Sequence, residues 1–168
     1  TAEFDKWVKL VEGEGARVYY AKSGDRVYLG TGILLDILWP AEDFRGKSVK
    51  ELNETSIIAR LRHGKNSMLF TGDMGRPTER RLIFESTNLD SDVLKVGHHG
   101  SKYSSLDEFL RAVSPEIAVI QVGRKNRYGH PTQEVLDRLA SVGAKIFRND
   151  LDGDVTVESD GNFLEVVK

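Results

Sequence analysis

The chain has 168 residues, of which 39% are hydrophobic and 30% charged, a balance that fits one globular domain rather than a disordered chain. It has no cysteine, which excludes disulfides and thiolate metal sites, so a metal ion would have to be held by His, Asp, Glu or water. The net charge of −2 excludes a general attraction for polyanions, and no apolar run approaches the roughly 18 residues of a membrane span.

The first half of the sequence predicts one helix and then a series of short strands. Residues 3–12 carry apolar side chains at the spacing of one helix face, namely Phe4, Trp7, Val8 and Val11. β-rich stretches bounded by glycine or proline predict strands at 16–20, 26–29, 33–38, 56–63 and 67–71. The last two are expected to form a hairpin, and the charged residues 41–53 a surface loop.

The second half alternates helices with strands. Helices are predicted at 77–85 and from about 132 to 142, and between them Ser105 and Glu108 form a capping-box pattern at the start of a further helix that ends before Pro115. Strands are predicted at 92–96, 117–122, 144–148, 155–158 and 163–167. The alternation implies parallel strands and the flanking hairpins imply antiparallel ones. We therefore expect an α/β (α+β) domain with roughly seven or eight strands, four helices and mixed sheets.

Asp73 and the pair His98-His99 each follow a predicted strand, with a glycine directly before them. Ligands of α/β sheets collect at the carboxyl ends of strands, so the sequence predicts one site at the ends of two neighbouring strands. An Asp at such a strand end can bridge two metal ions. The alternative is that Gly72-Asp73 makes an ordinary turn.

The two histidines are expected in extended backbone, where neighbouring side chains point in opposite directions. One imidazole would then face a metal ion and the other would face substrate or solvent. Ser101 and Lys102 follow, and their hydroxyl and cation suit phosphate oxygens. The alternative is a pair of loop histidines that bind nothing.

A second unusual loop, at 123–131, mixes cations with amide and ring side chains. It contains Arg124, Lys125, Asn126, Arg127, Tyr128 and His130. This mixture suits an anion that carries a planar or stacking group, although a solvated charged loop explains it equally well. His130, directly before Pro131, can also simply order a turn.

Two further polar features are not expected to bind a ligand. His63 lies beside the Gly64 turn with no potential ligand near it in sequence, so it is interpreted as structural or exposed. The stretch 150–154 is rich in Asp but lacks the spacing and flanking helices of a calcium loop, so a tight turn is expected there.

Four motifs occur in order along the chain: Asn53-Glu54-Thr55-Ser56, Thr71-Gly72-Asp73, His98-His99-Gly100-Ser101 and Arg127-Tyr128-Gly129-His130-Pro131. With these motifs the sequence resembles the metallo-β-lactamase superfamily, and within it the β-lactamase-like domain of the ComEC family of DNA-uptake competence proteins. The resemblance implies a four-layer αββα sandwich with two divalent metal ions, zinc or manganese. It also implies hydrolysis of phosphodiester bonds, with DNA, expected to be single-stranded, as the substrate during competence.

The resemblance assigns roles to individual residues. It makes Asp73 the metal-bridging carboxylate and His99 the late His ligand, with His98 and His130 as catalytic groups beside the substrate. The residues expected to bind substrate are Ser101, Lys102, Arg124, Lys125, Asn126 and Arg127. Asn53 and Ser56 occupy the stretch where many members of the superfamily place another His ligand.

The superfamily's upstream His-x-His-x-Asp-His motif does not occur in residues 1–168. The chain therefore resembles the later part of one domain, residues 1–168, without the N-terminal segment that holds most metal ligands. Alone it is expected to bind metal weakly, to cleave DNA little or not at all, and to self-associate through exposed sheet edge and apolar surface. The resemblance further implies the extracytoplasmic domain of a polytopic membrane protein, or a free-standing relative.

Two other functions fit the same residues. One is a metal-free binding module of the same fold that uses its basic loop to hold nucleic acid or a partner. The other is hydrolysis of a small phosphoester, which the modest net charge allows.

Overall fold

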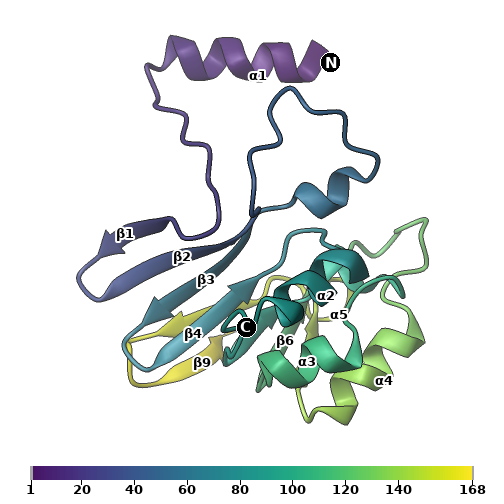
Figure 1. Ribbon diagram of the computed structural model, residues 1–168. Helices are drawn as coiled ribbons and strands as arrows, with labels where there is room; N and C mark the ends of the chain where they lie inside the picture. Colours follow the sequence, from purple (N-terminus) through teal and green to yellow (C-terminus); the bar gives the residue numbers. More distant parts are fainter. Residues whose placement is uncertain (1, 168) are drawn as a thin grey trace.

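The computed structural model describes residues 2–167, and its main feature is a mixed sheet in which seven strands follow one another in sequence order (Figure 1). These strands are β1 (Arg26–Gly30), β2 (Ile33–Trp39), β3 (Ile58–His63), β4 (Asn66–Phe70), β5 (Val93–Lys95), β6 (Ile117–Ile120) and β7 (Lys145–Arg148). The pairs from β1 to β4 are antiparallel, and the pairs from β4 to β7 are parallel. The predicted change from hairpins to parallel strands is confirmed.

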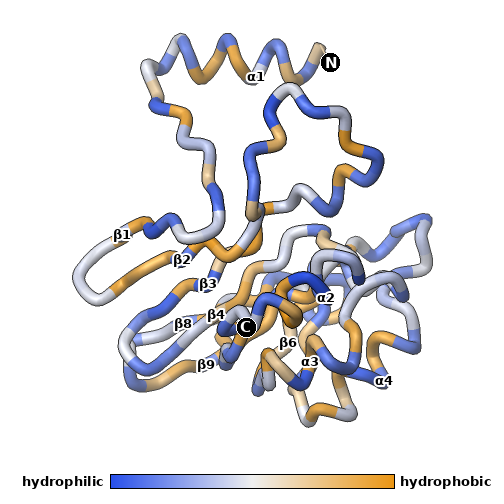
Figure 2. Tube along the Cα trace, viewed as in Figure 1, coloured by the Kyte–Doolittle hydropathy of each residue, from blue (hydrophilic) through white to orange (hydrophobic). Residues whose placement is uncertain are grey.

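Three helices cover one face of the parallel strands, and the main core lies between them and the sheet (Figures 1 and 2). They are α2 (Arg76–Phe84), α3 (Asp107–Val113) and α4 (Gln133–Ser141). Leu69, Leu94 and Ala118 stand in register on neighbouring strands and belong to this core. Phe109, Leu110 and Val113 supply the buried stripe of α3, as the apolar spacing predicts. Within residues 2–167, no helix has the length and apolar character needed to cross a membrane.

The C-terminal hairpin packs on β3 and β4. It consists of β8 (Thr156–Ser159) and β9 (Leu164–Val167), paired antiparallel. Val157 and Leu164 line a small cavity with Leu61 and Met68 of the main sheet. His63 contacts the carbonyl oxygen of Ser159 through Nδ1 at 3.1 Å and so joins the hairpin to β3.

The N-terminal helix α1 (Ala2–Gly13) forms as predicted, but it stands apart from the sheet (Figure 1). None of its residues is buried, and Phe4 and Trp7 stack on each other in solvent. The strand expected at 16–20 does not form. Those residues are exposed and irregular, because no strand within the described residues offers them a partner.

Two expectations about local structure are wrong. Ser105 does not cap α3, since its backbone has φ of 58° and its hydroxyl makes no hydrogen bond. The carboxylate of Glu79 in α2 accepts the N–H groups of Ser105 and Leu106 instead. The Asp-rich stretch expected to be a tight turn contains a one-turn helix, α5 (Asn149–Asp152).

The four-layer αββα sandwich is present only in part. The described residues form one seven-stranded sheet, helices on one of its faces and the two-stranded hairpin. Two short 3-10 helices, η1 (Leu52–Thr55) and η2 (Gly97–Gly100), flank the ends of β4 and β5. The site described below lies between them.

Candidate metal centre and substrate cleft

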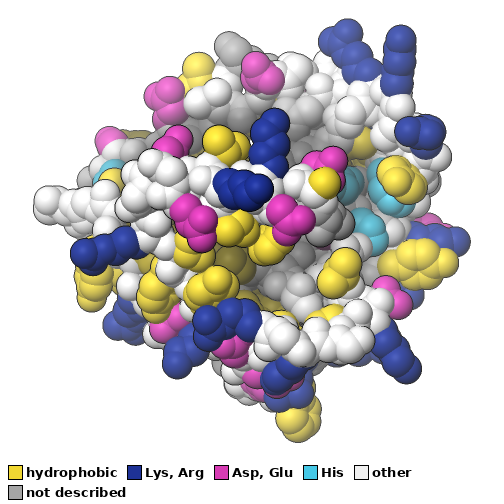
Figure 3. Space-filling view, turned by 90° about the horizontal axis from the view of Figure 1, so that it is seen from above, with side chains coloured by type: hydrophobic (Ala, Val, Ile, Leu, Met, Phe, Trp, Pro, Cys, Tyr) yellow, Lys and Arg dark blue, Asp and Glu magenta, His cyan; other side chains and the backbone are white. Residues whose placement is uncertain are grey.

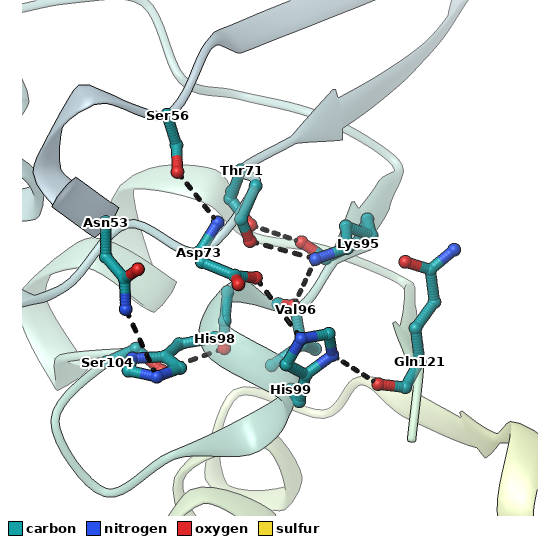
Figure 4. Close-up of polar contacts among 12 residues, drawn as sticks. Asn53, Ser56, Thr71, Asp73, Lys95, Val96, His98, His99, Ser104 and Gln121 are labelled. Carbon is teal, nitrogen blue, oxygen red and sulfur yellow. Dashed lines mark hydrogen bonds and ion pairs between the residues drawn. The ribbon is translucent and has the colours of Figure 1, made fainter. Parts of the chain in front are cut away.

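Asp73 and the histidine pair lie together at the carboxyl ends of β4 and β5 (Figure 4). These strands are parallel neighbours, so the turns that follow them emerge at the same edge of the sheet. Nε2 of His99 is 3.4 Å from Oδ1 of Asp73. The predicted meeting of these two side chains in one place is therefore confirmed.

The turn that presents Asp73 requires a glycine before it. Gly72 has φ of 52°, and a Cβ on it would lie 2.7 Å from the Cβ of Ser56. That close approach lets the hydroxyl oxygen of Ser56 accept the N–H of Asp73 at 3.1 Å. Ser56 thus holds the Asp73 backbone, at the position where the superfamily resemblance suggests a further ligand.

A buried lysine that lies outside the sequence motifs supports the same turn. Lys95, only 8% exposed, donates from Nζ to the carbonyl oxygens of Gly72 at 2.9 Å and Val96 at 3.3 Å. Burial lowers the pKa of Lys95, and the nearby charge of Asp73 opposes that shift. The one available signal was a lysine inside an otherwise apolar strand.

The histidines do not lie in extended backbone, and that expectation is wrong. His98 has φ and ψ of 48° and 41°, and His99 has 54° and 23°. Non-glycine residues adopt this left-handed conformation at a cost of roughly 1–2 kcal/mol each, and such strain is concentrated at functional sites. The two rings nevertheless face different partners.

The tautomer of His99 follows from its hydrogen bond. Its Nδ1 lies 2.7 Å from the carbonyl oxygen of Gln121, which can only accept, so Nδ1 carries a proton. Nε2 then faces the Asp73 carboxylate either as a lone pair or as a second N–H. Two acceptors at 3.4 Å repel each other unless a proton or a cation lies between them. Metal-bound histidines commonly have this bond from the other ring nitrogen to a backbone carbonyl.

His98 points to the other side of the pair. Its Nε2 accepts from the Asn53 amide nitrogen at 3.3 Å. Its ring meets the ring of His130 edge to face, with centroids 6.0 Å apart. Burial, followed by the charges of His98 and His99, lowers the pKa of His130, and its Nδ1 is buried without a hydrogen-bond partner. The lowered pKa favours the neutral form of His130.

The His130 loop is held against the histidine pair by backbone contacts. Gly100 has φ of 82°, and a Cβ on it would lie 2.5 Å from the Cβ of Pro131. Its carbonyl oxygen accepts the N–H of Thr132 at 3.0 Å. Asn126 closes the loop, because its side-chain amide bonds both the N–H and the carbonyl oxygen of His130 at 2.9 Å.

The remaining residues expected to bind substrate occupy different positions. Arg124, Lys125 and Arg127 are exposed, and no ion pair within residues 2–167 engages them. Lys102 is exposed as well, whereas the hydroxyl of Ser101 is buried and accepts the N–H of Tyr103. Figure 3 shows a cluster of histidine side chains near one edge of this face, with lysine and arginine side chains along the same edge.

Asp73 and His99 suit two positions in the coordination of one ion. Their 3.4 Å separation allows both atoms to reach an ion at the usual ligand distances of about 2.0–2.2 Å. Among residues 2–167, however, no three His, Cys, Asp or Glu side chains form a group that could hold a metal ion. A catalytic zinc site typically uses three protein ligands, so Asp73 and His99 alone would not complete one.

Acidic and imidazole groups therefore meet at the ends of parallel strands in an α/β domain, with exposed cations on a neighbouring loop. The profile of the Metallo-beta-lactamase superfamily matches residues 40–124, about half of the chain and the region that contains Asp73 and His99. The chain belongs to this superfamily.

Curated relatives place it closer to one group. The chain is 33% identical over 152 residues to ComE operon protein 3 of Bacillus subtilis, and 41% identical over 123 residues to competence protein ComA of Neisseria gonorrhoeae. Recombination protein 2 of Haemophilus influenzae is 37% identical over 114 residues. These matches cover 90%, 73% and 68% of this chain but 19%, 17% and 14% of the relatives. The domain is thus related to ComEC-family competence proteins, and it spans less than a fifth of their length.

A solved structure supports the fold. A protein from Parabacteroides distasonis, described provisionally as a metal-dependent hydrolase, superposes with a TM-score of 0.51. The alignment covers 85% of this chain and 62% of that one, at 16% sequence identity. The likeness is one of fold, and it agrees with a partial metallo-β-lactamase-like architecture.

Proposed function

We propose that this chain forms part of a metal-dependent phosphodiesterase that acts on DNA during DNA uptake. The observation that carries the proposal is the His99–Asp73 pair: Gln121 fixes a proton on Nδ1 and leaves Nε2 directed at a carboxylate 3.4 Å away. The names of the competence relatives support the biological context. The strain stored at both histidines supports a functional rather than a structural role.

In this proposal Asp73 and His99 hold divalent metal, which when bound supplies a nucleophilic hydroxide at neutral pH and polarises the phosphoryl group. Arg124, Lys125 and Arg127 bind and orient the phosphate backbone, because they are exposed and have no competing carboxylate within the described residues.

His98 and His130 are the groups that handle protons at the substrate. The lowered pKa of His130 favours its neutral form, so its imidazole can accept a proton beside His98. His98 keeps its Nδ1–H free for a phosphate oxygen while Asn53 donates to its Nε2. Asn126, whose amide is engaged within its own loop, keeps His130 in position rather than binding substrate.

The missing ligands come, in this proposal, from a segment outside residues 1–168 that also completes the sandwich. The domain would then be the later portion of a metallo-β-lactamase unit, located on the extracytoplasmic side of a membrane protein or in a free-standing relative. A centre of two ions, zinc or manganese, needs more ligands than Asp73 and His99 provide.

A cleavage assay tests the proposal. Fluorescent single-stranded DNA is incubated with manganese and either the 168-residue chain or the same chain carrying the segment that its reading frame encodes before Thr1. We expect little or no cleavage by the short chain and clear cleavage by the extended one. Asp73→Ala and His99→Ala should each lower that rate by at least about 100-fold, because each removes a ligand.

The matched controls are Asp90→Ala and His63→Gln, which change an exposed carboxylate and a hairpin histidine away from the centre. Robust cleavage by the short chain that the two site variants abolish would show that its ligand set is complete. Absence of cleavage by the extended chain would contradict the proposed function.

A metal-free nucleic-acid-binding module is the second candidate, and one observation favours it: no three-ligand group exists within residues 2–167. Under this alternative the extended chain would bind DNA through the basic loop without retaining metal. The metal content of the purified extended chain distinguishes the two functions.

A further inference from the structure

A cleft of about 310 Å³ opens beside the candidate metal centre, and the phosphate chemistry above makes no use of it. It is lined by His99, Gln121, Val122, Gly123, Asn126, Tyr128 and His130. His99 thus belongs to both sites: its Nε2 faces Asp73, and its ring forms one wall of the cleft. Whatever occupies the cleft lies directly next to a group bound at Asp73 and His99.

The cleft offers a flat aromatic surface. The rings of Tyr128 and His130 are nearly parallel, at 19°, with centroids 5.9 Å apart. Tyr128 is 82% exposed, so most of its ring contacts no other part of the protein. An exposed ring at the mouth of a cleft, beside a buried Val122, suits a planar ligand with an apolar face.

The charges around this surface identify the kind of planar ligand. Arg124, Lys125 and Arg127 belong to the same loop and are exposed, so the ligand carries negative charge next to its ring. Proteins bind single-stranded nucleic acid through two features, a cationic groove for the backbone and aromatic rings on which the bases stack.

Hydrogen bonds within the loop fix its shape. Asn126 bonds the carbonyl oxygen of Gly123 at 3.2 Å and both backbone groups of His130, and these bonds fix the two ends of the segment that carries Tyr128. A preformed surface loses less entropy when a ligand binds.

We propose that this cleft binds one unpaired nucleobase, stacked on Tyr128, next to the candidate metal centre at Asp73 and His99. The inference rests on the proposed function in taking DNA as the substrate, and it adds that the protein contacts a base directly, through the ring of Tyr128. A base in a duplex is stacked and paired, so it would have to be extruded before it could enter.

Binding measurements test the inference without requiring cleavage. Anisotropy is recorded at low salt, without metal, for a fluorescent single-stranded oligonucleotide and for an abasic oligonucleotide of the same length and charge. We expect Tyr128→Ala to weaken binding of the normal oligonucleotide by at least about fivefold. It should leave binding of the abasic one unchanged, and Tyr128→Phe, which keeps the ring, should bind both as the unmodified chain does.

The control is Tyr28→Ala, because Tyr28 is similarly exposed at 77% but lies on β1, away from the cleft. Equal losses for the two oligonucleotides, an equal loss in Tyr28→Ala, or no DNA binding at all would overturn the inference. Failure of the cleavage assay together with a base-dependent effect of Tyr128→Ala would remove the proposed catalysis and leave the base site intact.

Discussion

Gly100 determines how closely the two histidine-bearing loops approach each other. Its left-handed backbone and the 2.5 Å approach of Pro131 to a Cβ there leave room for no side chain. Gly72 has the same function on the other side of the centre, against Ser56. Two glycines therefore set the positions of Asp73 and His130, and the chemistry depends on residues that have no functional groups.

We predict that Gly100→Ala destabilises the protein by about 1–3 kcal/mol more than Gly143→Ala does, because only the first change also forces a clash with Pro131. Gly143 is the matched control, since its φ of 79° is close to the 82° of Gly100 but nothing lies within 4 Å of its added Cβ. Urea unfolding of the two variants and the unmodified chain at one pH measures both losses of stability. Equal losses in the two variants would show that the backbone conformation alone requires Gly100.

At the scale of elements, α2 and α3 are joined by the buried carboxylate of Glu79. It accepts two backbone N–H groups at the start of α3, and Arg138 and Arg76 are the nearby charges. Burial raises the pKa of Glu79 to about 7, while those hydrogen bonds and cations oppose the shift. The loop between the histidine pair and α3 is thus held by a group that titrates near neutrality.

The raised pKa predicts a specific pH dependence. Above pH 4.5 the unfolded state loses the Glu79 proton, whereas the folded state keeps it up to about pH 7. The stabilisation that Glu79 contributes to the folded state is therefore complete below pH 4.5 and is lost as the pH rises through about 7. Relative to Glu79→Gln, the unfolding free energy of the unmodified chain should fall by about 3 kcal/mol across this window. Urea unfolding of both proteins at several pH values gives the difference, and a difference independent of pH would contradict the assignment.

Local sequence patterns predicted the order and type of the helices and strands, but not the hydrogen bonds and backbone conformations at their ends. The order of strands and helices from β1 onward follows from apolar spacing, and the pairing of Asp73 with His99 follows from their places after two such strands. The capping box at Ser105 failed because Glu79, far back in the sequence, bonds the same N–H groups. The left-handed conformation of His98 and His99 has no local signal beyond the flanking glycines, because contacts with other elements impose it.

At the scale of the whole molecule, the described residues form a partial sandwich with an open side. The edge strand β1 exposes Tyr28 and Leu29, and α1 exposes Phe4, Trp7 and Leu10. Figure 2 shows apolar and polar residues alternating along α1, which lies apart from the sheet. Self-association through these surfaces stays a prediction, and so does their coverage by the segment that would complete the metal centre.

Zinc titration of the 168-residue chain by calorimetry tests the central claim most directly, because the claim is that Asp73 and His99 are two ligands of an incomplete metal centre. We predict one weak site, in the micromolar to millimolar range, that disappears in both Asp73→Ala and His99→Ala and persists in His63→Gln. Unchanged zinc binding in a chain that carries both alanine substitutions, or loss of binding in His63→Gln alone, would contradict the account.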